Sequence, residues 1–196
     1  MANAFIFDWG GVLIDNPHED FLDYFAQKLH IDKEKLGQMH SLFGKDYSLG
    51  MSEEKLWKKV YAHFSIDPSV PTPSWEAALP ILFREKKKII DVVSTLRAKG
   101  KKIALLSNTE IPTATYFPTT SYAHLFDVQV FSCFEKIIKP DPRIYEITLQ
   151  KLGVPPSETV FIDDKKKNVE AAENLGMTGI VFDDEDKVVK QLLALS

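Results

Sequence analysis

The sequence predicts an α/β fold in which a parallel sheet of five strands carries helices on both faces, with a helical segment inserted after the first strand. Three observations carry this prediction. Five short apolar runs are typical of strands that are covered on both faces. Amphipathic stretches with helical spacing alternate with the later runs, which implies parallel strands with right-handed crossovers. The long stretch between the first two runs contains helical patterns and no confident strand.

Composition limits the classes of protein that need to be considered. The chain has 196 residues, 44% of them hydrophobic, which suits one domain with a modest insertion and argues against disorder. A formal net charge of −4 gives no electrostatic reason to expect nucleic acid or an anionic membrane as a partner. The single Cys133 excludes an intramolecular disulfide and a cysteine-rich metal site. With no signal-peptide pattern and no run of about 20 apolar residues, we expect a cytoplasmic protein.

The first predicted strand, Phe5 to Phe7, ends at Asp8, and Gly10 and Gly11 follow at once. Open α/β sheets bind their ligands at the carboxyl ends of the strands, which is where Asp8 stands. Taken alone, this short motif is also compatible with an aspartate that only caps the next turn, although a ligand site is the favoured interpretation.

The inserted segment is predicted to consist of helices. Asn16 followed by Pro17 and Glu19 predicts the start of the first helix, with Asn16 at the N-cap and Pro17 as the first helical residue. Asp32 and Ser52 are predicted to cap the second and third helices, and a further helical stretch is predicted to begin at Ser74. We therefore predict a helical cap domain over residues 17–83 and a core domain formed by residues 1–16 and 84–196. The aromatic stripes of the cap domain are expected to form its own core.

The rest of the chain alternates between helices and strands, which predicts a Rossmann-like core. Glycines stand where the predicted helices end, as a left-handed C-terminal residue requires. These glycines are Gly100, Gly153 and Gly176. The remaining strands are predicted at 103–106, 128–131, 160–162 and 179–182, and the last helix at 185–195.

Polar side chains follow four of these strands: Asp8, Ser107, Lys139 and the pair Asp163 and Asp164. In a parallel sheet these strand ends share one edge, so the side chains are expected to converge. A carboxylate can attack phosphorus and form an aspartyl-phosphate. Carboxylates on neighbouring strands are typical protein ligands of Mg²⁺. A hydroxyl and an ammonium group can hold phosphoryl oxygens.

The residues around these positions resemble the four motifs of the haloacid dehalogenase superfamily. The matching stretches are Phe-Asp8-Trp-Gly-Gly-Val-Leu, Leu-Ser107-Asn-Thr, Lys139-Pro-Asp-Pro-Arg-Ile-Tyr and Val-Phe-Ile-Asp163-Asp164. Within the superfamily, the chain is most similar to small sugar-phosphate phosphatases of the α-D-glucose-1-phosphate phosphatase type. It also resembles the N-terminal phosphatase domain of soluble epoxide hydrolase.

The resemblance implies a role for each matching residue. Asp8 is expected to be the nucleophile and a metal ligand, and Lys139 to neutralise the phosphoryl group and orient Asp8. The Mg²⁺ ligands are expected to be Asp8, the Gly10 carbonyl, Asp163 and Asp164. Ser107 and the Asn108 amide are expected to hold the phosphoryl group. The implied partner is a small phosphorylated metabolite, and we expect a monomer or weak dimer that binds neither nucleic acid nor membrane.

One position departs from the superfamily pattern. Most of its phosphatases carry a second aspartate two residues after the nucleophile as general acid and base, and here that position is Gly10. Asp15 is the nearest other carboxylate, although capping the first inserted helix is its expected task. Gly10 leaves open a phosphate-sensing or scaffold protein with little or no turnover. A metal-free dehalogenase is a third alternative, against which the acidic pair argues.

Overall fold

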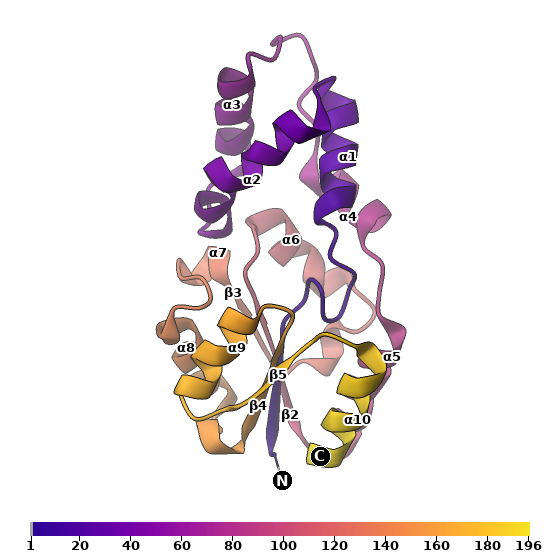
Figure 1. Cartoon of the computed structure of the whole chain (residues 1–196), viewed down its shortest axis with the longest axis vertical. Coiled ribbons are helices and arrows are strands. Elements are labelled where there is room, and N and C mark those ends of the chain that lie inside the picture. The colour runs from indigo at the N-terminus through magenta and orange to yellow at the C-terminus, as the bar shows by residue number, and fades with distance from the viewer. Residues whose placement is uncertain (1) are drawn as a thin grey trace.

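The central element is a five-stranded, fully parallel sheet with the strand order β3-β2-β1-β4-β5. The computed structural model of the chain describes residues 2–196 (Figure 1). The strands are β1 (Ala4–Phe7), β2 (Lys102–Ser107), β3 (Val128–Phe131), β4 (Thr159–Asp163) and β5 (Thr178–Val181). The Rossmann-like sheet predicted from the sequence is therefore confirmed, with each strand within a residue or so of its predicted position.

Helices cover both faces of the sheet. On one face pack α5 (Lys87–Ala98) and α10 (Glu185–Leu195), and on the other α8 (Pro142–Leu152) and α9 (Lys166–Asn174) (Figure 1). The alternation of side chains along β1 explains why both layers are needed. Phe5 and Phe7 belong to the apolar core under α5 and α10, whereas Ala4 and Ile6 belong to the core on the opposite face. Short helices complete the core: α6 (Ile111–Tyr116), α7 (Ser132–Glu135), η1 (Phe117–Thr119), η2 (Ala123–Leu125) and η3 (Pro156–Glu158).

The inserted segment consists of α1 (His18–Leu29), α2 (Lys33–Ser48), α3 (Glu53–Phe64) and α4 (Trp75–Leu82), at the end of the molecule beyond the carboxyl edge of the sheet (Figure 1). These helices share an apolar cluster of their own, with Phe25, Leu36 and Val60 almost wholly buried. The predicted N-cap residues Asp32 and Ser52 are confirmed, since their side chains accept hydrogen bonds from first-turn amides. Ser74, where a further helical stretch was predicted to begin, is the N-cap of α4. Among residues 2–196, no helix is both long and apolar enough to span a bilayer.

The predicted start of α1 is wrong by one residue. The helix begins at His18, and Pro17 occupies the N-cap position without a side-chain hydrogen bond. Asn16 still contributes, because its Oδ1 accepts a hydrogen bond from the His18 amide at 3.2 Å. The predicted helix-capping task of Asp15 is also wrong, since its carboxylate lies 2.7 Å from Lys86 Nζ.

The segments that connect the inserted helices to the core run antiparallel to each other, and we call residues 13–16 and 84–86 the paired linkers. Ile14 and Glu85 form an antiparallel bridge. The Asp15 amide donates to the Arg84 carbonyl at 2.9 Å, and the Lys86 amide donates to the Leu13 carbonyl at 2.8 Å. This pairing places Asp15 opposite Lys86, which is why it is not available to α1.

Candidate active site

Asp8 lies at the carboxyl end of β1, the central strand, between the ends of β2 and β4. It is buried, and its Oδ1 accepts a hydrogen bond from the Trp9 amide at 2.7 Å. The same oxygen lies 2.9 Å from Lys139 Nζ. Because β1 is flanked by the strands that end in Ser107 and Asp163, the strand order brings the predicted residues to one edge.

Lys139 is the buried cation at this edge. Its Nζ lies 2.6 Å from Asp163 Oδ2 and donates to the Leu106 carbonyl at 2.8 Å. Asn108 holds the lysine backbone at both ends of the residue. Its Oδ1 accepts from the Lys139 amide at 2.8 Å, and its Nδ2 donates to the Lys139 carbonyl at 3.0 Å.

This engagement changes what Asn108 can offer to a ligand. Lys139 takes up Oδ1 and one N–H of the side-chain amide, which leaves the second side-chain N–H and the main-chain N–H as donors toward a ligand. Ser107 is buried beside Asn108 and lines the same cavity as Asp8 and Lys139. The Asn108 side chain therefore positions Lys139. The position of Asn108 after a predicted strand did not indicate this role.

Three carboxylates converge at this edge: Asp8, Asp163 and Asp164 each offer an oxygen, and these oxygens lie within 4.8 Å of one another. Asp163 is fully engaged, since besides Lys139 it accepts hydrogen bonds from Asn168 Nδ2 and from the Lys165 amide. Asp164 is not, because its buried Oδ1 has no hydrogen-bond partner among residues 2–196. Hard oxygen donors with one unsatisfied carboxylate fit a divalent cation such as Mg²⁺, and Asp164 offers it the freest oxygen.

The pKa shifts agree with the contrast between the hydrogen-bonded Asp163 and the unsatisfied Asp164. Burial raises the pKa of Asp8 to about 7, although the Lys139 ammonium works in the opposite direction. Burial also raises the pKa of Asp164. Around Asp163, burial acts in the same sense, but the Lys139 ammonium and the hydrogen bonds to the carboxylate outweigh it, so the pKa lies below its ordinary value. A bound cation would favour the ionised forms of Asp8 and Asp164.

The two glycines after Trp9 differ in their backbone geometry. Gly11 has a φ of +83°, and a Cβ added there would lie 2.8 Å from Cγ of Asp164. Gly10 has no such φ, and a Cβ added there would meet nothing within 4 Å. The turn therefore requires a glycine at Gly11, where the backbone passes close to the acidic pair, and not at Gly10.

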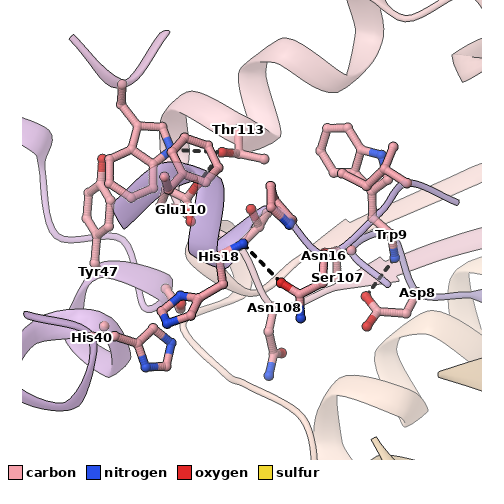
Figure 2. Close-up of a pocket in the computed structure, with 18 of the residues that line it drawn as sticks. Asp8, Trp9, Asn16, His18, His40, Tyr47, Ser107, Asn108, Glu110 and Thr113 are labelled. Atoms are coloured by element: carbon pink, nitrogen blue, oxygen red, sulfur yellow. Dashed lines mark hydrogen bonds between the residues drawn. The ribbon is translucent and has the colours of Figure 1, made fainter. Parts of the chain in front are cut away.

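A cavity of about 220 Å³ opens between this edge and the inserted helices (Figure 2). Its floor contains Asp8, Ser107 and Lys139, and its roof contains Tyr47 and Trp75 from the inserted helices. Core and roof meet directly, because Trp75 Nε1 donates to Thr113 Oγ1 at 3.2 Å, and the Thr113 hydroxyl donates to Glu110.

The sequence analysis missed the lining residues Tyr47, Trp75, Glu110 and Thr113. The two aromatic residues lie on helical stripes that are indistinguishable in sequence from core positions, and both are indeed buried. Glu110 follows the Ser107 motif by three residues, and this proximity was the only signal available.

A buried Asp–Lys pair and an acidic pair lie at the carboxyl edge of a parallel sheet, beneath inserted helices. These features define a hydrolase with a Rossmann-like core. The chain belongs to the haloacid dehalogenase-like hydrolase family, whose sequence profile matches residues 2–176.

Curated relatives match parts of the chain. It is 37% identical over 130 residues to acyl-CoA dehydrogenase family member 10 of Mus musculus, a match covering 65% of this chain and 12% of that protein. It is 33% identical over 100 residues to a phosphorylated carbohydrates phosphatase of Thermotoga maritima, covering 50% of this chain and 46% of that protein. The chain thus spans less than half the length of these relatives.

Solved structures match nearly the whole chain. A HAD-like family hydrolase from Porphyromonas gingivalis superposes with a TM-score of 0.75 at 23% identity, covering 98% of both chains. A HAD family enzyme from Bacteroides thetaiotaomicron in a magnesium complex superposes with a TM-score of 0.73 at 24% identity, covering 92% of both chains. At this level of identity the likeness establishes the fold.

Proposed function

We propose that this protein is a Mg²⁺-dependent phosphomonoesterase for a small phosphorylated metabolite, with Asp8 as the nucleophile. The observation that carries the proposal is the position of the Asp8 carboxylate on the cavity floor, 2.9 Å from the Lys139 ammonium. An oxygen of Asp8 attacks phosphorus, the bond to the leaving oxygen breaks, and an aspartyl-phosphate forms. Water then attacks this intermediate, which releases inorganic phosphate and regenerates Asp8.

The other site residues take supporting roles in this proposal. Lys139 neutralises the phosphoryl group and fixes Asp8, while the Ser107 hydroxyl and the Asn108 N–H hold phosphoryl oxygens. Asp8, the Gly10 carbonyl and Asp164 would hold Mg²⁺, with Asp163 contributing through water because its own oxygens are engaged. The cation would offset the repulsion between the carboxylate and the anionic substrate.

The proposal also divides the chain into a core domain (1–16 and 84–196) that carries the chemistry and a cap domain (17–83) that selects the substrate. The roof of the cavity comes from the second of these, which supports the division. A sugar phosphate is one candidate substrate, supported by the resemblance to sugar-phosphate phosphatases and by the name of the Thermotoga relative.

Gly10 favours a second candidate, a phosphate-sensing or scaffold protein with little turnover. Nothing within 4 Å would obstruct a Cβ at this position, so sterics do not explain why the acid–base side chain is missing.

A panel of phosphomonoesters that includes 4-nitrophenyl phosphate and glucose 1-phosphate tests the proposal through phosphate release with Mg²⁺ and with chelator. Asp8→Asn should abolish release, and Asp91→Asn, on the exposed side of α5, serves as the control. Full activity in chelator or in Asp8→Asn would overturn the mechanism. Absence of turnover in the wild type would favour the sensing or scaffold function.

A further inference from the structure

We propose that the roof of the cavity binds a positively charged ammonium group, so that the preferred substrates are phosphate monoesters of amino alcohols. The phosphate would lie at Asp8 and the ammonium group between Tyr47 and Glu110. This inference rests on the proposed function and deepens it by naming the substrate class.

The first observation is the aromatic character of the roof. Trp75 packs against Phe21, with ring centroids 4.8 Å apart, and against Tyr47 at 5.2 Å. These three rings and Phe25 all line the cavity. The faces of aromatic rings carry negative electrostatic potential, and several such rings around one space are a recurring means of binding ammonium groups. An aromatic wall alone would equally suit an uncharged apolar group, so a preference for a cation requires negative charge nearby.

The second observation is the charge that surrounds this wall. Glu110 lines the cavity, and Glu53 lies behind Trp75, where its Oε1 accepts from the Trp75 amide at 2.6 Å and from Trp57 Nε1 at 3.1 Å. Neither carboxylate forms an ion pair with a lysine, arginine or histidine among residues 2–196. Buried or half-buried carboxylates are normally paired with a cation, because desolvation of an unpaired charge is costly. A cation in the cavity would supply the missing charge.

The third observation is the hydroxyl of Tyr47. This residue is 4% exposed, its ring lines the cavity, and its hydroxyl has no hydrogen-bond partner among residues 2–196. Figure 2 shows Tyr47 and Glu110 on one side of the pocket and Asp8 on the other. A hydroxyl oxygen can accept a hydrogen bond from an N–H group. An ammonium group would therefore satisfy both Tyr47 and Glu110.

Glu110 is fixed in orientation for this task. The Thr113 hydroxyl donates to it, and Thr113 in turn accepts from Trp75 Nε1 at 3.2 Å. Burial raises the pKa of the unliganded Glu110 carboxyl, which agrees with the lack of a cationic partner. The basic side chains of the lining are His18, His40 and Lys165 in addition to Lys139. Lys139 is occupied by Asp8 and Asp163, and the others form no ion pair with Glu110.

The cavity has room for a substrate of this class. Its volume is about 220 Å³, whereas about 150 Å³ suffices for benzene in a protein interior. A phosphate together with a short aminoalkyl chain fits within this volume.

The test uses matched substrates that differ only in charge. Each ω-aminoalkyl phosphate, with chains of two to six carbons, is compared with the alkyl phosphate in which a methyl group replaces the ammonium. The measured quantity is the ratio of the two kcat/KM values. We expect the amine to be preferred about tenfold or more at the chain length that reaches Tyr47 and Glu110, the factor typical of one charge-assisted hydrogen bond or a desolvated cation–π contact.

Two variants assign this preference to residues. Glu110→Gln and Tyr47→Phe keep the shape of the cavity and should each lower the ratio, with thermal melting to check that the variants are folded. Glu54→Gln, on the exposed side of α3, is the control and should leave the ratio unchanged. A ratio near one at every chain length would overturn the inference, as would a preference that survives both variants. Hydrolysis of 4-nitrophenyl phosphate separates this outcome from failure of the proposed function, which predicts that this ester is cleaved in either case.

Discussion

Nζ of Lys139 lies 2.6 Å from Oδ2 of Asp163, and the two side chains are 1% and 0% exposed. The same ammonium group lies 2.9 Å from Asp8, so a single buried cation is shared by two carboxylates. This sharing holds the pKa of Lys139 above its ordinary value even though burial alone would lower it. The lysine therefore stays charged and links Asp8 to the acidic pair.

Asp163→Asn is expected to lower the free energy of unfolding by about 3 kcal/mol, because removing one member of a buried ion pair leaves the other incompletely compensated. Urea denaturation measures the change. Asp183→Asn removes an exposed pair with Lys187 and should have a much smaller effect, because solvent screens the two charges. Equal effects of the two substitutions would contradict the structural role assigned to Asp163.

Asp164→Asn is expected to reduce the stabilisation that Mg²⁺ confers, because a neutral amide replaces the carboxylate whose oxygen has no hydrogen-bond partner among residues 2–196. Without Mg²⁺ the variant should be at least as stable as the wild type, since one of three neighbouring carboxylates loses its charge. Thermal midpoints with and without Mg²⁺ measure both effects. An unchanged Mg²⁺-induced shift would argue against Asp164 as a ligand.

Gly10 leads to a prediction about leaving groups. With no side-chain acid at this position, the wild type should cleave an aryl phosphate much faster than an alkyl phosphate, which needs a proton on its leaving oxygen. Gly10→Asp should raise the alkyl rate, by as much as about 10²-fold if the new carboxyl reaches that oxygen. The backbone at Gly10 accepts a side chain, so the variant should fold.

The matched control is Gly11→Ala. An alanine there would have to keep the φ of +83°, and its Cβ would meet Asp164. This variant should therefore lose stability and Mg²⁺ affinity. If wild type cleaves both esters equally fast, another group supplies the proton. Asp15→Asn then shows whether that group is Asp15, which its ion pair with Lys86 makes a poor candidate.

Asp127 provides a prediction about pH. Burial tends to raise its pKa, but hydrogen bonds from the Ile103 amide and Arg97 outweigh this effect and hold the pKa below its ordinary value of 3.8. Its stabilising contribution is therefore present above about pH 4 and is lost as the pH falls through the folded-state pKa.

Asp127→Asn should be less stable than wild type by about 1 kcal/mol at pH 6, a modest value because both partners are over a third exposed. The difference should shrink as the pH falls below about 4 and Asp127 takes up a proton. Denaturation curves at several pH values measure it, and a constant difference across this range would contradict the argument.

The sheet and the convergence of the site were predictable from the sequence because they depend on chain order and strand ends. Once the strands are parallel, Asp8, Ser107 and Asp163 must lie at one edge. By contrast, the use of the Asn108 side chain depends on a backbone 31 residues away, and Asp15 on a lysine 71 residues away. Tyr47 was not predicted as a site residue because aromatic residues at helical spacing form the same sequence pattern whether they line a core or a cavity.

The antiparallel bridge between Ile14 and Glu85 has a consequence for how such a chain can change in evolution. The chain leaves the core for the inserted helices and returns to it at two neighbouring points that are joined by hydrogen bonds. The two ends of the inserted segment are therefore held together, whatever lies between them. A shorter, longer or unrelated segment could occupy this place without rerouting any strand of the sheet. The inserted helices can thus be replaced as a unit in evolution, while the residues at the carboxyl edge of the sheet keep their positions.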